Sequence, residues 1–194
     1  LVNNTSLYDG TSEIAAAPMN AAATEKTKQL YQFLQQNYGQ KIVTGQYVSD
    51  SSGKELDEIY NITGKYPLIR FADMNAYSPN GGDETKATAV ADSLAWAEEG
   101  GVVGLSWLWN APTGTASFYE KDTSFDLKTA VTDADVAGKS EEELSKMVSN
   151  GEITQNCYAL ISDIDHISEA LKPLADADVP VLWRPLPEAG GGWY

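Results

Sequence analysis

The chain has little cysteine, little histidine and few basic residues, and each shortage excludes or disfavours a class of protein. Its 194 residues hold one cysteine, Cys157, so an intramolecular disulfide is impossible. They also hold one histidine, His166, which lies in a helical pattern far from any predicted strand end. A histidine-based catalytic triad and a histidine-ligated zinc site are therefore excluded from this segment. We expect no cofactor or metal, and we interpret His166 as a surface or packing residue.

Basic residues are also scarce, because 13 lysines and arginines stand against 28 acidic residues, for a net charge of −15. Phosphate binding requires basic patches, so the charge excludes nucleic acid and disfavours anionic membrane surfaces as partners. No apolar run approaches the roughly 18 residues of a membrane span, and no basic-then-apolar leader opens the chain. A neutral polysaccharide is compatible with this charge, although an acidic composition more often serves solubility alone.

The chain divides into a short leading segment and one domain. Residues 14–23 are small and uncharged and are interrupted by Pro18, which is typical of a linker. We therefore predict an N-terminal segment over residues 1–23, followed by a single domain over residues 24–194.

Apolar runs alternate with helical patterns through this domain. Strands are predicted at Lys41–Tyr47, Pro67–Ala72, Val102–Trp107 and Val179–Leu186, and helices at Glu25–Tyr38, Lys54–Thr63, Thr85–Glu99 and Cys157–Ala175. Ser140 and Glu143 form a capping-box pattern that predicts a short surface helix between the last two strands. Pro173 is expected to kink the last helix or to end it early.

The alternation of strands and helices predicts an α/β fold with a parallel sheet. Four such units suit either a doubly wound sheet or half of a (β/α)8 barrel. The first strand ends in Gln46 and Tyr47 with no glycine-rich phosphate motif after it, so dinucleotide binding is disfavoured. We prefer the half barrel, whose site forms where strands end and helices begin.

Polar and aromatic side chains gather at these predicted strand ends. They are Gln46, Tyr47, Asp73, Asn75, Trp107, Trp109, Asn110, Arg184, Glu188 and Trp193. Flat indole rings stack on sugar faces, while carboxylates and amides bind hydroxyl groups, so the mixture favours a sugar site. Because no histidine lies at these strand ends, catalysis there would depend on carboxylates. Glycoside hydrolysis by paired carboxylates is the main reaction of that kind.

Each of these residues also has a structural interpretation. Trp107 lies within an apolar strand and suits the core equally well, whereas Trp109 and Trp193 are expected to be exposed for ligand contact. Asp73 can cap the next turn instead of binding substrate. We expect Arg184 to be a buried or half-buried partner of carboxylates such as Asp73 or Glu188 rather than a direct substrate contact.

The motifs WRPLPEAGGGWY, KIVTGQY, FADMNAYS and VVGLSWLWNAPTG resemble those of glycoside hydrolase family 26, whose members are mostly endo-β-1,4-mannanases. The resemblance covers almost all of residues 24–194. It implies a (β/α)8 TIM barrel, of which this chain covers about the first four βα units. It also implies that Glu188 is the general acid/base and that Trp193 lines the subsite at the cleaved bond. Trp107, Trp109 and Asn110 would lie on the rim of the glycone side.

The family's nucleophile is a second glutamate at the end of strand seven, so we expect it in a C-terminal half of the barrel that this segment lacks. The expected function is a retaining endo-β-1,4-mannanase acting on β-mannan, secreted or at the cell surface, and possibly fused to carbohydrate-binding modules. Leu108 and Pro187 stand where the family commonly has histidine. They leave open a non-catalytic β-glycan-binding relative, and mixed-linkage β-glucan or β-xylan remain alternative substrates.

Overall fold

The computed structural model of the chain describes residues 15–188. Its centre is a four-stranded parallel sheet in the order β1-β2-β3-β4. The strands are β1 (Gly45–Tyr47), β2 (Ile69–Asp73), β3 (Val102–Trp107) and β4 (Val181–Pro185). Each strand pairs with its neighbour in sequence, so every crossover advances in the same direction. A doubly wound sheet would reverse that direction at a switch point, and the four strands of the described residues contain no such reversal.

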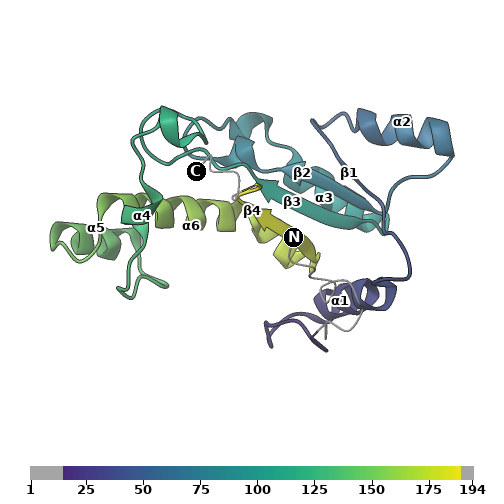
Figure 1. Ribbon diagram of the computed structural model, residues 1–194, viewed down its shortest axis with the longest axis horizontal. Helices are drawn as coiled ribbons and strands as arrows, with labels where there is room; N and C mark the ends of the chain where they lie inside the picture. Colours follow the sequence, from purple (N-terminus) through teal and green to yellow (C-terminus); the bar gives the residue numbers. More distant parts are fainter. Residues whose placement is uncertain (1–14, 189–194) are drawn as a thin grey trace, which may run out of the picture.

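Helices connect and cover the strands, as Figure 1 shows. They are α1 (Glu25–Asn37), α2 (Lys54–Thr63), α3 (Ala89–Glu98), α4 (Leu127–Ala130), α5 (Glu141–Ser149) and α6 (Gln155–Asp176), with short 3-10 turns η2 (Asn75–Tyr77), η3 (Glu84–Lys86) and η4 (Glu120–Asp122). Helix α3 contacts β2, β3 and α6, while α4 and α5 pack on α6 at the left of Figure 1.

Local signals fix several helix ends. The Thr24 hydroxyl accepts a hydrogen bond from the Thr27 amide at the start of α1, and the Thr154 hydroxyl accepts one from the Cys157 amide at the start of α6. The capping box predicted at Ser140 is present, with both of its hydrogen bonds, at the start of α5.

Several predicted boundaries differ from the structure, most of all the starts of β1 and of α3, which begins at Ala89 rather than at Thr85. β1 begins at Gly45 rather than at Lys41, because within the described residues β1 pairs on one side only, with three residues of β2. Of the two outcomes expected at Pro173, a kink or an early end, the early end is wrong, because α6 continues to Asp176. The Pro173 carbonyl still accepts the Ala177 amide at 3.2 Å, and Leu174 is anchored in the core at 1 % exposure. Burial therefore offsets the missing amide of the proline.

The core lies between the sheet and helices α3 and α6. Its most buried side chains include Val103, Leu105, Met74 and Leu174. Gly104 allows close packing on the other face of β3, because a Cβ there would lie 2.1 Å from the Phe71 ring. A second, smaller cluster joins α5 to α6.

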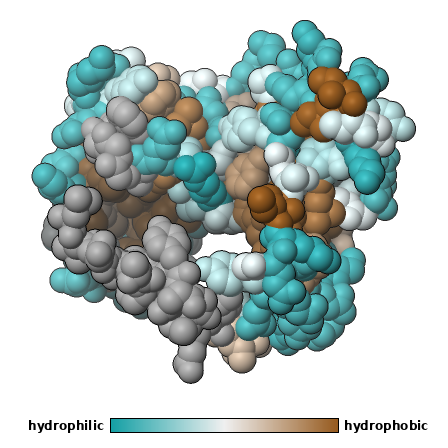
Figure 2. Space-filling view, turned by 45° about the vertical axis from the view of Figure 1, so that its right-hand side comes forward, coloured by the Kyte–Doolittle hydropathy of each residue, from teal (hydrophilic) through white to brown (hydrophobic). Residues whose placement is uncertain are grey.

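The surface carries apolar as well as charged groups. Figure 2 shows brown apolar surface interrupting the teal hydrophilic surface of one face. Large side chains with high exposure include Ile42, Ile62, Tyr60, Tyr66 and Trp183. Within residues 15–188, every helix is too short or too polar to cross a membrane.

Candidate active site

A cavity of about 520 Å³ opens where the carboxyl ends of the strands meet. Its lining comprises Tyr47, Asp73, Ser106, Leu108, Phe118, Tyr119, Arg184, Pro187 and Glu188. The cavity brings together four residues that the sequence singled out: Tyr47 from the end of β1, Asp73 from the end of β2, and Arg184 and Glu188 from the end of β4. Parallel strands direct their carboxyl ends to one edge of a sheet, and this shared edge is why distant residues meet here.

Asp73 organises the ends of β2 and β3. Its carboxylate accepts hydrogen bonds from the Ser106 hydroxyl at 2.6 Å, from the Leu108 amide at 3.1 Å and from the Asn75 amide at 2.7 Å. The predicted capping of the next turn is therefore present. The other bonds hold β3 and the residues after it against β2, so Asp73 shapes the cavity wall.

Tyr47 contributes an aromatic face and a hydroxyl to the cavity. Its ring stacks on Phe71, with centroids 6.3 Å apart, and its hydroxyl lies 3.4 Å from the Ser106 hydroxyl. Burial raises the pKa of the Tyr47 hydroxyl, and the nearby Asp73 charge acts in the same direction, against the hydrogen bond with Ser106. The hydroxyl therefore stays protonated and can donate a hydrogen bond.

Arg184 and Glu188 extend the cavity from the end of β4. Both side chains are exposed, so the expectation of a half-buried Arg184 is wrong. Leu186 and Glu188 hold left-handed backbone, with φ of 50° and 63°. The Leu186 amide donates to the Trp107 carbonyl at 3.3 Å. This sharp turn ends the strand and places the Glu188 carboxylate at the cavity.

The two tryptophans of the third-strand motif lie behind the cavity. Trp107 and Trp109 are 5 % and 4 % exposed, so the core interpretation of Trp107 is correct and the expected exposure of Trp109 is wrong. The Trp107 indole donates to the Ser78 hydroxyl at 2.9 Å, and the Trp109 indole donates to Asp163 at 2.6 Å. Successive side chains of a strand point to opposite faces, so Ser106 and Leu108 line the cavity while the tryptophans face away.

Asn110 has a structural role in this geometry. It is 8 % exposed, accepts a hydrogen bond from the Asn75 side chain at 3.3 Å and donates to the Asn80 carbonyl at 3.0 Å. These contacts join the loops after β2 and β3, so its expected place on the rim facing substrate is wrong. Trp193 lies outside the described residues.

Sequence reasoning missed two aromatic residues that line the cavity, Phe118 and Tyr119. Their rings are 4.2 Å apart at 38°, and the Lys121 ammonium lies 5.4 Å above the Tyr119 ring. The pair stands in the long connection after β3, where adjacent aromatics between turn residues were an available signal. The alternation along β3 would likewise have identified Ser106.

Metal chemistry finds no support in the side-chain geometry. Among residues 15–188, no three His, Cys, Asp or Glu side chains gather as a metal site requires. His166 lies on α6 with its ring nitrogen 3.1 Å from the Glu84 carboxylate, which agrees with its interpretation as a surface residue. What the cavity offers is two carboxylates, a guanidinium, hydroxyls and aromatic rings.

Comparison with known proteins identifies the fold and the family of this chain. The sequential parallel strands are about the first four βα units of a (β/α)8 barrel, as in the structures that the chain resembles. The model of glycosyl hydrolase family 26 matches residues 19–194, and the chain belongs to that family.

Named relatives agree with this assignment. A mannan endo-1,4-beta-mannosidase from Thermothelomyces thermophilus is 37% identical over 185 residues, which cover 90% of this chain and 34% of that protein. The Podospora anserina GH26-CBM35 β-(1,4)-mannanase superposes with a TM-score of 0.73 at 34% identity, over 93% of this chain and 38% of that one. A β-mannanase from a symbiotic protist of the termite Reticulitermes speratus was solved in complex with gluco-manno-oligosaccharide. It superposes with a TM-score of 0.71 at 27% identity, over 94% of this chain and 55% of that one. The chain thus spans about a third of the length of the curated relative.

Proposed function

We propose that this chain supplies the acid/base side of the active site of a retaining endo-β-1,4-mannanase. The observation that carries the proposal is the Glu188 carboxylate, exposed at a cavity that Arg184, Tyr47 and the Phe118–Tyr119 ring pair also line. Relatives named as mannan endo-1,4-beta-mannosidases, one of them 37% identical, support β-1,4-mannan as the substrate.

In this mechanism Glu188 first protonates the glycosidic oxygen of the leaving sugar, while a second carboxylate attacks the anomeric carbon from the opposite face. Glu188 then takes a proton from the water that hydrolyses the glycosyl–enzyme intermediate. Such a pair of carboxyl groups stands about 5–5.5 Å apart. The aromatic rings of Tyr119 and Tyr47 would stack on sugar faces, and Arg184 would donate hydrogen bonds to hydroxyl groups.

Asp73 is the other described carboxylate on the cavity, and we do not assign it the nucleophilic role. Both of its oxygens already accept hydrogen bonds, from Ser106 and from the Leu108 and Asn75 amides. These bonds tie it to the strand ends rather than leaving it free to attack. The proposal therefore leaves the nucleophile to a carboxylate outside these 194 residues.

Two attributes of the whole protein belong to the same proposal. A polymeric substrate outside the cell requires a secreted or cell-surface enzyme. The Podospora mannanase, which carries a CBM35 module by its name, supports fusion to carbohydrate-binding modules.

The test uses the full-length protein and the substitution Glu188→Gln, which keeps the size of the side chain but cannot transfer the proton. Loss of an acid/base group lowers turnover by about 10²–10⁴-fold, measured as new reducing ends from β-1,4-mannan. Glu152→Gln, on an exposed glutamate after α5, is the matched control and should retain wild-type turnover. Equal turnover by the Glu188 variant would overturn the assignment.

A substrate panel distinguishes the alternatives. Release of reducing ends from mixed-linkage β-glucan or β-xylan, but not from mannan, would replace the substrate and keep the chemistry. Binding of manno-oligosaccharides in isothermal titration, with no cleavage by the intact protein, would favour a non-catalytic binding relative. Proton NMR of the first products reports the anomer, and retention of configuration is the expected result.

A further inference from the structure

Three aromatic side chains form a continuous cluster on the outside of the fold. They are Tyr60 on α2, Tyr66 between α2 and β2, and Trp96 on α3, and we call them the aromatic platform. The Tyr60 and Tyr66 rings stack, with centroids 4.6 Å apart and 22° between their planes. Trp96 lies edge-on to Tyr66 at 6.1 Å and 87°. Because Tyr60 and Tyr66 are 46% and 50% exposed, part of each ring is open to solvent.

The platform is held in place by its surroundings. The Trp96 indole donates a hydrogen bond to the Leu68 carbonyl at 3.3 Å. Gly101 leaves the space that this indole occupies, because a Cβ there would lie 2.1 Å from the indole nitrogen. Tyr66 in turn packs between the other two rings. Rings fixed in this way lose little conformational freedom when they bind a ligand, so the platform is preorganised.

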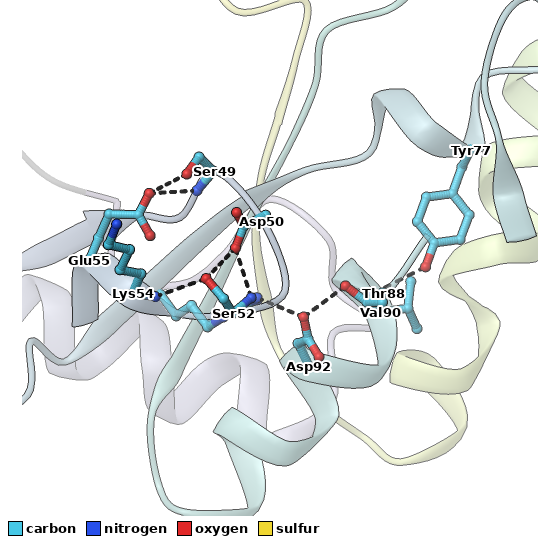
Figure 3. A network of polar contacts seen from close by, with 10 residues as sticks. Ser49, Asp50, Ser52, Lys54, Glu55, Tyr77, Thr88, Val90 and Asp92 are labelled. Carbon is cyan, nitrogen blue, oxygen red and sulfur yellow. Dashed lines mark hydrogen bonds and ion pairs between the residues drawn. The ribbon is translucent and has the colours of Figure 1, made fainter. Parts of the chain in front are cut away.

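The platform and the candidate active site lie at opposite ends of the sheet. Figure 3 shows the starts of α2 and α3, where the Glu55 carboxylate accepts from the Ser49 amide at 3.1 Å and the Asp92 carboxylate accepts from the Thr88 hydroxyl at 2.9 Å. This is the end at which the strands finish and the catalytic cavity opens. Both helices then run back along the sheet, as crossover helices between parallel strands do. Since the platform lies near the carboxyl ends of these helices, it lies toward the starts of the strands.

The rest of the barrel does not cover this surface. Helix α2 links β1 to β2, and α3 links β2 to β3. Further strands of a (β/α)8 barrel add beyond β4 and close the sheet at the free edge of β1. The junction between α2 and α3, which the platform bridges, therefore stays on the surface of the complete domain.

The size and charge of this surface select among partners. The charged side chains nearest to it in the sequence are Asp57, Glu58, Lys65, Glu98 and Glu99, all of them exposed. Carboxylates predominate, so an anionic partner is disfavoured. A standard protein interface buries about 800 Å² on each partner, far more than three partly exposed rings provide. A neutral polysaccharide fits both limits, because its sugar rings stack singly on aromatic faces and carry no charge.

We propose that the aromatic platform binds a second stretch of the neutral β-mannan chain, remote from the cavity where cleavage is proposed. The proposal rests on the proposed function, because it takes its ligand from there. A polymer held at two places on one protein molecule rebinds intramolecularly when either contact opens. The platform would thus keep the enzyme on its polymer between cleavage events.

The test measures nitration of individual tyrosines by tetranitromethane, read by peptide mass spectrometry with and without soluble galactomannan. It uses the full-length protein with Glu188→Gln, so that the polymer is not cleaved. Tyrosines of one molecule then report separately on each site: Tyr60 and Tyr66 on the platform, Tyr47 and Tyr119 on the cavity, and Tyr38, which is 61% exposed at the end of α1, on neither.

Saturating galactomannan should slow the nitration of Tyr60 and Tyr66 relative to Tyr38, whereas the acidic polymer polygalacturonate should not. Tyr60→Ala should raise the galactomannan concentration that half-protects Tyr66 by about two- to tenfold, the factor that one aromatic stacking contact implies. Tyr60→Phe keeps the ring and should leave that concentration unchanged. The comparison with and without polymer still carries the test if circular dichroism shows that Tyr60→Ala does not fold.

The possible outcomes separate this proposal from the proposed function. Protection of Tyr47 and Tyr119 alone would overturn the platform and leave the proposed function standing. Protection of Tyr60 and Tyr66 alone would support the platform and refute the cavity as the mannan site. Protection at none of these tyrosines would refute mannan as the ligand of either site. Protection that follows the protein concentration instead of galactomannan would indicate a contact between copies of the chain, and it would also overturn the proposal.

Discussion

The indole of Trp109 donates a hydrogen bond of 2.6 Å to the carboxylate of Asp163, and both residues are 4 % exposed. The bond joins the residues after β3 to the middle of α6, 54 positions later in the chain. The Phe125 ring packs edge-on against the Trp109 indole, with an angle of 84° between the two ring planes. This contact holds the tryptophan behind the cavity, next to the part of its wall that Leu108 forms.

Asp163 should make the stability of the protein depend on pH. Burial raises the pKa of its carboxyl, more than the hydrogen bond from Trp109 lowers it. The folded state therefore binds this proton more tightly than the unfolded state. The resulting stabilisation is complete below the ordinary pKa of aspartate and disappears as the pH rises through the raised value.

Two substitutions separate the charge of Asp163 from its hydrogen bond. Asp163→Asn keeps an acceptor for the indole and removes the buried charge, so its free energy of unfolding at neutral pH should equal or exceed that of the wild type. Asp163→Leu leaves the indole N–H unpaired and should cost about 1–3 kcal/mol. Urea unfolding from mildly acidic to neutral pH measures both. An Asn variant as unstable as the Leu variant would contradict this interpretation.

Asp73 is expected to act on stability and on substrate binding together. Asp73→Ala removes the acceptor of the Ser106 hydroxyl and of the Leu108 amide, and should lower the free energy of unfolding by about 1–3 kcal/mol. Asp73→Asn retains an acceptor oxygen and should lose less. Thermal unfolding, combined with KM for mannan in the full-length protein, tests the pair. Equal stability of the Ala variant and the wild type would show that these bonds contribute nothing.

Gly104 should tolerate no side chain while Phe71 is present. A Cβ at position 104 would lie 2.1 Å from the Phe71 ring, so Gly104→Ala should cost about 1–3 kcal/mol through overpacking. The same change in a Phe71→Leu background should cost less, because the smaller side chain leaves space. A double-mutant cycle by urea unfolding measures the difference. Additive losses would mean that the contact with Phe71 is not the cause.

Removing only one partner of the Arg70–Asp92 ion pair should lower the free energy of unfolding strongly. Burial lowers the pKa of Arg70, and the Asp92 charge opposes this shift. Asp92→Leu leaves the guanidinium without its anion and should destabilise the protein by about 3–5 kcal/mol. Arg70→Met combined with Asp92→Leu should recover part of that loss. No recovery in chemical denaturation would indicate that each residue stabilises the fold independently.

The sequence alone predicts those elements whose signals are local. Helix α2 has its predicted bounds, Lys54–Thr63, because Gly64 ends it in a left-handed conformation with φ of 70°. Strand β3 also has its predicted bounds, since Ser106 is the one polar side chain in an otherwise apolar run of six residues. The four strand ends converge as expected, because a parallel arrangement requires it.

The remaining errors concern contacts between distant residues. The exposure of Trp109 depends on Asp163 and Phe125, and no pattern near Trp109 reveals either partner. The length of β1 depends on how much of β2 it can pair with, and the continuation of α6 past Pro173 depends on burial of Leu174. Arg70 drew no attention in the sequence, since its pairing with Asp92 exists only in the folded arrangement.

The left-handed backbone at Leu186 and Glu188 lowers stability at the end of β4 while it positions the Glu188 carboxylate at the cavity. A non-glycine residue in that conformation lowers stability by about 1–2 kcal/mol. The position of the Glu188 carboxylate is therefore obtained at a loss of stability. A glycine at either position would relieve this cost. At 186, however, it would make the turn that positions Glu188 less rigid, and at 188 it would remove the carboxylate that we propose as the acid/base. Directed evolution for heat resistance should therefore retain the non-glycine residues at positions 186 and 188 whenever activity is also selected.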